Sequence, residues 1–398
     1  MEKRYYLDYN STTRLLPAVL NAMRPYLEDQ FGNPSSIHFW GRHARAALDD
    51  AREELAQLLG AQAKEIVFVS GGTEANNLAI LGVARALRSK GNHLITCATE
   101  HHSVLDPCRH LKSEGFDVTV LPVDSHGQLN ITSLENALRS NTILVSIMSA
   151  NNETGTLQPI QQIGALCRQR GILFHCDAVQ SFGKEMVDVR QWKADLLTIS
   201  AHKFYGPKGA AALYVRTGVS LERILWGGTQ ENERRGGTEN VAAIVGMATA
   251  ARHAVADIGS KNQRLFRLTE KLWEGLSSSI DGICRNGHSE KRLGNTLNAS
   301  FEDCDGESLP IALDLEGIGV SNGSACMVGS VQPSHVLRAM GVPKKRIQNS
   351  IRFSLGVDSK EENIPEIVEC VSRVVKRLRN TSDPIKSHSA QELPVPQI

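Results

Sequence analysis

EIVFVSGGTEANNLAILGVARALRS (65–89) joins a β-rich run to a helical pattern through a glycine turn, and this unit recurs along the chain. Helical patterns such as IQQIGALCRQR (160–170) separate further β-rich runs. These runs are HLITCAT (93–99), DVTVLPV (117–123), TILVSIMSA (142–150), ILFHCDA (172–178), DLLTISA (195–201) and AALYVR (211–216). Strands that alternate with helices predict an α/β fold with a mostly parallel, doubly wound sheet. Because ligands bind at the carboxyl ends of strands in such sheets, polar residues that follow strands become candidates for a functional site.

The pattern changes after residue 250, which predicts a second, smaller domain. A long amphipathic helix over 260–280 and a final helix over 361–379 flank short β-rich runs there. We predict an N-terminal segment (1–15) that packs with the small domain, a large domain (16–258) and a small α+β domain (259–380). The remaining residues, 381–398, are polar and proline-bearing, which predicts a flexible tail.

Composition narrows the classes of function. The chain has 398 residues, 41% of them apolar, and its 44 basic and 43 acidic residues give a formal net charge of +1. This balance predicts neither a nucleic-acid partner nor a membrane surface, and it favours a small polar substrate. No apolar run is long enough to span a bilayer, and the first residues lack the apolar core of a signal peptide, so we expect a cytoplasmic protein.

The eight cysteines contain no CxxC pair. Their scatter argues against a zinc site and a thioredoxin-like motif, so we expect free thiols and no bound metal.

SAHKFYGPKG (200–209) is the strongest local signal for chemistry. Lys203 follows a predicted strand, where a desolvated amine could form a Schiff base with an aldehyde. Ser200 and His202 could donate to a phosphate. The alternative is an exposed lysine at the edge of a strand.

HCDAVQ (175–180) places Asp177 at the end of another strand, with Gln180 close behind. A carboxylate there could pair with a protonated pyridine nitrogen, while the glutamine amide bonds a ring hydroxyl. A simple turn or helix cap is the alternative interpretation.

SGGTEANN (70–77) and TEHHSV (99–104) also follow strands. Gly72 and Thr73 open a helix whose first amides could bind a phosphate, although an ordinary capped turn has the same pattern. One of the two histidines, His101 or His102, could stack on a planar cofactor and move protons. A metal site is the weaker alternative, because no second cluster has ligand-like spacing.

SNGSACMVGSVQPSHVL (321–337) places Cys326 in a glycine-bearing stretch that predicts a mobile loop. A thiol that carries a group from a cofactor to an acceptor needs such a loop and a nearby base. A half-buried structural cysteine is the alternative. In SIRFSLG (350–356), Arg352 stands in a strand-like run and could bind a substrate carboxylate with both arms, or form a structural salt bridge.

In this order the motifs resemble the cysteine desulfurases of the NifS and IscS type, which have fold type I of the pyridoxal-phosphate enzymes. The resemblance covers nearly the whole chain and includes YLDYNSTT (6–13), FGNPSS (31–36), ANNETGT (150–156) and RRGGTEN (234–240). It implies a homodimer that uses pyridoxal 5′-phosphate to remove sulfur from L-cysteine. Cys326 would attack the substrate sulfur, leaving L-alanine and a persulfide for an iron–sulfur scaffold or another carrier protein.

The resemblance also implies a role for each matching residue. Lys203 would hold the cofactor, Asp177 its pyridine nitrogen and Gln180 its ring hydroxyl, and His101 would stack on the ring as the acid–base group. The phosphate would be bound by Gly72, Thr73, Ser200 and His202, and by Thr238 of the partner subunit. Contacts to the substrate would come from Asn33, Asn152 and Arg352, and Asn152 would also contact the cofactor.

The sequence departs from the usual family pattern at Asn322, Met327 and Val328 around Cys326, and at Asn232, where an arginine is usual. These departures bear on partner choice and on contacts near the substrate. The alternatives on the same fold are a selenocysteine lyase and an aminotransferase of small amino acids. A non-enzymatic relative is a third, and it would have no need of both Lys203 and Cys326.

Overall fold

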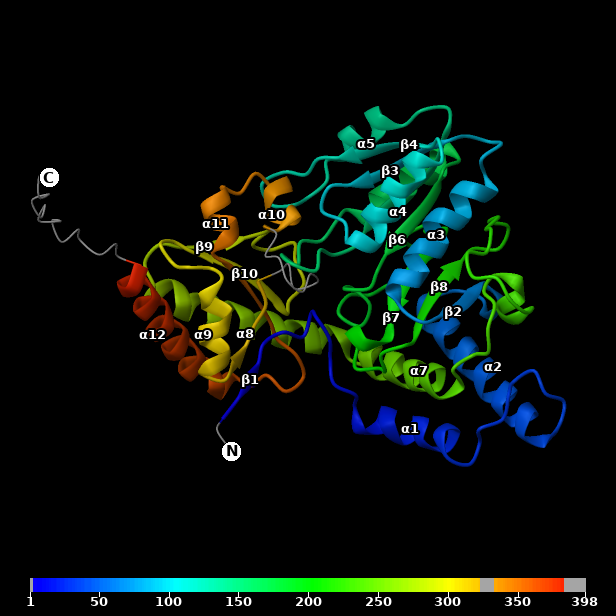
Figure 1. The fold of residues 1–398 in the computed structure, drawn as a ribbon, viewed down its shortest axis with the longest axis horizontal. Helices are drawn as coiled ribbons and strands as arrows, with labels where there is room; N and C mark the ends of the chain where they lie inside the picture. The colour runs from blue at the N-terminus through cyan, green and yellow to red at the C-terminus, as the bar shows by residue number, and fades with distance from the viewer. Residues whose placement is uncertain (1–2, 323–332, 383–398) are drawn as a thin grey trace, which may run out of the picture.

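The computed structural model describes residues 3–322 and 333–382 of the chain. Figure 1 shows a large sheet with its helices on one side of the molecule and a smaller group of helices and strands on the other. The predicted loop around Cys326 and nearly all of the predicted tail lie outside the described residues.

The large part contains a seven-stranded sheet with the order β2-β8-β7-β6-β5-β3-β4. Its strands are β2 (Ile66–Val69), β3 (His93–Cys97), β4 (Asp117–Leu121), β5 (Thr142–Met148), β6 (Leu173–Asp177), β7 (Leu196–Ser200) and β8 (Ala211–Val215). Strand β8 is antiparallel to β2 and β7, and the other neighbours pair in parallel. The predicted mostly parallel α/β sheet is therefore confirmed.

Helices cover both faces of this sheet. They are α1 (Pro17–Leu27), α2 (Phe39–Leu59), α3 (Gly72–Ala86), α4 (His102–Ser113), α5 (Ile131–Ala137), α6 (Ile160–Arg170) and α7 (Val241–Val255). Along β2, Ile66 and Phe68 join the core shared with α2, α6 and α7, while Val67 and Val69 join the core under α3 and α4. Successive side chains of a strand point to opposite faces, and full burial of each contributes roughly 1.5–3 kcal/mol. Because both faces of β2 are buried, its sequence does not alternate between apolar and polar residues.

The smaller part is built on an antiparallel sheet, β12-β10-β9, and a parallel pair, β1-β11. Its strands are β1 (Tyr5–Tyr6), β9 (Ile283–Asn286), β10 (Thr296–Phe301), β11 (Ile318–Gly319) and β12 (Ser350–Ser354). Its helices are α8 (Ile258–Ser279), α9 (Ser308–Leu315), α10 (His335–Ala339), α11 (Lys344–Gln348) and α12 (Ile364–Ser382). Strand β1 lies in this part, and the chain then crosses to α1 beneath the large sheet (Figure 1). The domain boundaries predicted from the sequence stay predictions.

No single helix within residues 3–322 and 333–382 is long and apolar enough to cross a membrane. Helices α7 and α8 pass that test only as a pair, which bends by 73°, and most of α7 is buried in the core.

A buried ion pair anchors the segment that precedes RRGGTEN. Both arms of the Arg52 guanidinium donate to the Glu231 carboxylate, at 2.7 and 2.6 Å, and the Phe68 amide donates to the same carboxylate at 2.8 Å. The Glu231 side chain is only 1% exposed. Asn232, one of the departures from the family pattern, has φ 55°, a left-handed conformation that asparagine tolerates better than most residues.

We expect Glu231→Ala to lower the free energy of unfolding by about 3–5 kcal/mol, because it leaves the Arg52 charge buried without its partner. The measurement is urea unfolding followed by circular dichroism. Glu233→Ala, which removes an exposed carboxylate two residues away, is the matched control. A loss below about 1 kcal/mol for Glu231→Ala, the size typical of an exposed pair, would contradict this prediction.

Candidate active site

A cavity of about 470 Å³ lies at the carboxyl ends of the large sheet's strands, where the N-terminal segment and β12 close it. Its wall contains Asp8, Asn10, Ser11, Gly72, Thr73, Asn76, His101, Ser103, Met148, Ala150, Asn152, Asp177, Val179, Gln180, Ser200, His202, Lys203 and Arg352. Every site residue predicted from the sequence is in this wall except Asn33, Thr238 and Cys326. Residues from distant parts of the chain thus meet in one cavity.

Lys203 reaches the cavity from a short 3-10 turn, Ala201–Lys203, that directly follows β7. Its amine donates to the backbone carbonyls of Asn10 and Ser11, at 2.7 Å each. Tyr205, two residues later, has φ 70°, and its amide donates to the Thr13 hydroxyl at 2.7 Å. Such a left-handed tyrosine is a strained conformation that its surroundings must hold, so the N-terminal segment fixes the turn that presents the amine.

Asp177 ends β6, next to β7 in the sheet, and its carboxylate is held by two donors. The Asn76 amide donates to one oxygen at 2.7 Å, and the Val179 backbone amide donates to the other at 2.9 Å. The other donor contact of Asn76 is to the Ser103 hydroxyl, at 2.8 Å. The Asn76 carbonyl oxygen is buried and has no hydrogen-bond partner among the described residues.

Asn76 was missed by sequence reasoning, although a signal was present. It lies four residues after Gly72 on α3, so one helical turn brings it back to the side of the helix that faces the cavity.

We expect Asn76→Ala to lower kcat/KM roughly ten- to a hundredfold, because it removes a hydrogen bond to a buried charged group. Steady-state kinetics with the assay described below measure the effect. Asn77→Ala is the matched control, since the Asn77 amide donates to the backbone carbonyl of Thr73 and not to Asp177. Equal effects of the two substitutions would contradict a specific role for Asn76.

His101 is the N-cap of α4 and lies in the cavity wall. Its Nδ1 accepts from the Ser103 backbone amide at 3.1 Å, so in the neutral ring the proton is on Nε2. Burial lowers the pKa of His101, and the nearby Asp177 carboxylate only partly opposes this. The ring is therefore neutral near pH 7, and protonating it costs free energy because the charged form is buried.

Gly72, Thr73, Ser200 and His202 lie together in the wall, at the N-terminus of α3 and the end of β7. A Cβ added at Gly72 would lie 3.1 Å from a Val179 methyl, a tight contact that glycine avoids. Burial lowers the pKa of His202 to about 4, and the Lys203 charge lowers it further, which leaves a neutral imidazole. Free helix amides with hydroxyl and imidazole donors form a suitable site for a phosphate.

Arg352 projects from β12 and already has partners. Its guanidinium donates to Asp8 at 2.6 Å, to the Ser11 hydroxyl at 2.7 Å and to the Asn152 carbonyl at 2.9 Å. The side chain is only 3% exposed. The structural salt bridge is thus present, and binding of a substrate carboxylate by Arg352 stays a prediction.

Asn33 and Thr238 do not line the cavity. Asn33 is exposed between α1 and α2, where its side-chain oxygen accepts from the Ser35 amide at 2.9 Å. Thr238 is exposed just before α7. Cys326, with its neighbours Met327 and Val328, lies outside the described residues.

The seven described cysteines are free, and all but Cys284 are buried. Burial raises the pKa of Cys97 and Cys304 to about 11, and that of Cys108 and Cys167 to about 12. These thiols therefore stay protonated near neutral pH and are poor nucleophiles. Among the described residues, no group of three or more His, Cys, Asp or Glu side chains could hold a metal ion.

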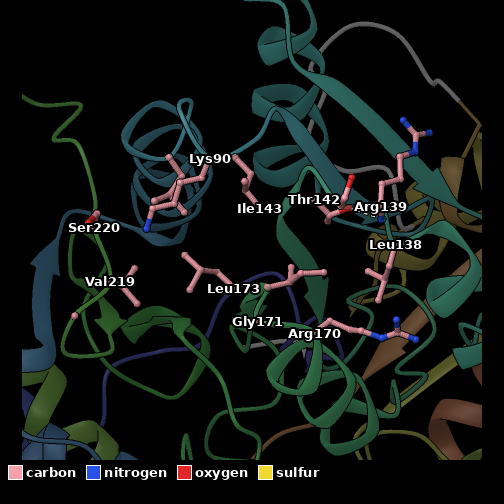
Figure 2. A pocket seen from close by; sticks show the side chains of 14 residues that line it. Lys90, Leu138, Arg139, Thr142, Ile143, Arg170, Gly171, Leu173, Val219 and Ser220 are labelled. Carbon is pink, nitrogen blue, oxygen red and sulfur yellow. Dashed lines mark hydrogen bonds between the residues drawn. The ribbon is translucent and has the colours of Figure 1, made fainter.

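A second cavity, of about 520 Å³, lies at the opposite, amino-terminal edge of the sheet (Figure 2). Arg139 and Arg170 project away from its centre in this view, and they pair with Asp117 and Glu135. Lys90 also lines this cavity, but its described wall has no acidic residue and no histidine, so we do not assign chemistry to it.

Comparison with known proteins identifies the family of this chain. The Aminotransferase class-V family model matches residues 5–367. A protein named cysteine desulfurase IscS from Dictyoglomus turgidum is 47% identical over 382 residues, which is 96% of this chain and 97% of that protein. Its namesake from Methanosarcina thermophila is 47% identical, over 96% of this chain and 94% of its own length.

Solved structures agree as well. One described as a NifS-like protein has a TM-score of 0.89 and 36% identity, and covers 94% of this chain and 100% of its own. Another, described as SspA in complex with cysteine, has a TM-score of 0.78 and 37% identity over 89% of this chain and 99% of its own. By the family match, the identity and the fold together, the chain belongs to the class-V aminotransferase family.

Proposed function

We propose that this protein is a cysteine desulfurase that depends on pyridoxal 5′-phosphate and converts L-cysteine to L-alanine. The observation that carries the proposal is the placement of the Lys203 amine and the Asp177 carboxylate at the ends of neighbouring strands, β7 and β6, in the wall of one cavity. An amine and a buried carboxylate are the two groups that a pyridoxal cofactor requires at opposite ends of its ring.

The residues present fit this cofactor. The buried Asp177 carboxylate is oriented by Asn76, and Gly72 leaves room beside the first amides of α3 for a phosphate. In our proposal Lys203 holds the cofactor aldehyde, Asp177 its ring nitrogen and Gln180 its ring hydroxyl. Thr73, Ser200 and His202 complete the phosphate site together with Thr238 of the partner subunit. When bound, the cofactor supplies an electron-withdrawing ring that stabilises negative charge at the substrate α-carbon.

The protein's own groups then divide the remaining tasks. In this proposal Lys203 and His101 move protons at the substrate, since both lie in the cavity wall. Asn152 and Arg352 orient the substrate in this proposal, with Asn152 also contacting the cofactor, and Asn33, which is outside the cavity wall, is assigned no contact. The reaction therefore needs the cavity to exclude water while it admits one amino acid.

Sulfur transfer requires a nucleophile, and we assign it to Cys326. Its thiolate would form an S–S bond with the substrate sulfur as the substrate C–S bond breaks, and the electron pair left on carbon is protonated to give alanine. The names of the relatives support L-cysteine as the substrate. The persulfide would pass to an iron–sulfur scaffold or another carrier protein.

Exposed apolar side chains support a homodimer. Phe31, Ile37 and Trp226 are 72%, 91% and 68% exposed, and Phe39 and Trp40 are about half exposed. Four of these five side chains lie within residues 31–40, and such a group of large exposed apolar side chains is typical of an interface between proteins. Light scattering after gel filtration would report a dimer, and a monomer for a variant with Ile37→Asp and Trp40→Asp. A wild-type monomer would contradict this part of the proposal.

The deciding experiment supplies L-cysteine and a thiol reductant to purified protein that has been loaded with pyridoxal 5′-phosphate. We expect alanine and sulfide in equal amounts. A keto acid without sulfide would instead indicate an aminotransferase. Alanine from L-selenocysteine but not from L-cysteine would indicate a selenocysteine lyase.

A further inference from the structure

A separate cavity of about 250 Å³ lies behind the candidate active site, and Lys203 lines both. This 250 Å³ cavity also contains Lys184, which is not part of the active-site wall. Lys184 follows HCDAVQ in the sequence, and none of the roles assigned above uses it. Lys184 and Lys203 therefore line the same cavity, and of these two lysines only Lys203 also lines the active site.

The Lys184 amine contacts Gln180 twice. It lies 3.0 Å from the Gln180 backbone carbonyl and 3.2 Å from the side-chain oxygen of the same residue. At its other end, the Gln180 amide nitrogen donates to the Asn10 carbonyl at 3.0 Å, and that carbonyl also accepts from Lys203 at 2.7 Å. Two lysines are therefore joined through one glutamine and one shared backbone oxygen.

This chain of contacts fixes which way the Gln180 amide points. A backbone carbonyl only accepts hydrogen bonds, so the Lys184 amine that contacts the Gln180 carbonyl donates there, and it also lies within hydrogen-bond distance of the Gln180 side-chain oxygen. The oxygen of the amide must therefore face Lys184, and its nitrogen must face the Asn10 and Lys203 side, where the active-site cavity lies. The Asn10 carbonyl requires the nitrogen on its side, and Lys184 holds the oxygen at the opposite end of the same amide.

The surroundings of Lys184 are unusual for a structural lysine. Basic side chains of Lys203, His253, Lys261 and Arg264 line the same cavity, and the described part of that wall has no acidic residue. Burial lowers the pKa of Lys184 to about 7, and the charges of Lys203 and Arg352 add to the effect. A desolvated amine without a carboxylate partner is costly to keep, so its contacts to Gln180 are its main compensation among the described residues.

We propose that Lys184 is a positioning residue, which holds the Gln180 amide from behind so that its nitrogen is presented to the cofactor. This inference rests on the proposed function only through the identity of the cofactor. It predicts that Lys184 acts through Gln180 and not by itself.

A double-mutant cycle tests this, with the affinity of the apoprotein for pyridoxal 5′-phosphate as the measured quantity. Lys184→Met is expected to weaken binding roughly tenfold, the size of one hydrogen bond to a charged group. In a Gln180→Ala background the same substitution should have less than about a twofold effect, because contacting residues that act as one unit are not additive. Lys261→Met, in the wall of the same cavity, is the control and should leave binding unchanged.

Additive effects of the two substitutions would overturn the proposal, and so would unchanged binding in Lys184→Met. Thermal unfolding of each apoprotein checks the fold, and Lys184→Gln, which keeps a donor, replaces Lys184→Met if that variant is unfolded. Lys184→Gln should retain most of the affinity if positioning is the role. A wild type that binds the cofactor but releases no sulfide would contradict the proposed function and leave this inference intact.

Discussion

Replacing Lys203 with alanine should abolish the visible absorption of the bound cofactor and lower alanine formation at least about a thousandfold. The amine is the only one in the wall of the active-site cavity as the structure describes it. Lys184 donates to Gln180 from the separate 250 Å³ cavity. We therefore expect no second lysine to take over the aldehyde.

The measurement combines an absorption spectrum after dialysis with the product assay. Lys208→Ala, which changes an exposed lysine in the same SAHKFYGPKG segment, is the matched control and should keep both the spectrum and the activity. A Lys203→Ala protein that retains the visible band after dialysis would show that another amine holds the cofactor, and the site would have to be reassigned.

Replacing Cys326 with alanine should abolish the release of sulfide from L-cysteine while the cofactor stays bound. The described thiols cannot substitute for it, because burial raises the pKa of Cys97, Cys108, Cys167 and Cys304 to about 11 or 12. A protonated, buried thiol is a poor nucleophile. The loss should therefore be near complete, at least about a hundredfold.

Cys284→Ala is the control for this experiment, since Cys284 is the one described cysteine that is not buried and it lies on β9, away from the cavity wall. It should retain full activity. If Cys326→Ala releases sulfide as fast as the wild type, Cys326 is not the nucleophile, and a lyase mechanism without a persulfide becomes the better explanation.

Most elements could be predicted because their signals are local. The run IQQIGALCRQR was predicted as a helix, and α6 has the same bounds, Ile160–Arg170. The β-rich runs became β2 to β8, since continuous apolar segments bounded by turns match strands that are buried on both faces. The end of α3 was predicted too late, at residue 89 instead of Ala86. The Leu87 amide still bonds to Val83, four residues back, but the Arg88 amide bonds to Arg85, only three residues back, so the last turn tightens there.

The α/β fold and the grouping of Lys203, Asp177 and His101 could be inferred from local patterns, because parallel strands bring their carboxyl ends to the same edge of a sheet. The contact of Lys203 with the Asn10 carbonyl, 193 residues away, and the pairing of Arg352 with Asp8, 344 residues away, became visible only in the folded chain. The hydrogen bond from Asn76 to Asp177 did so as well. Such contacts depend on how distant segments return to one another, and local periodicity carries no information about that path.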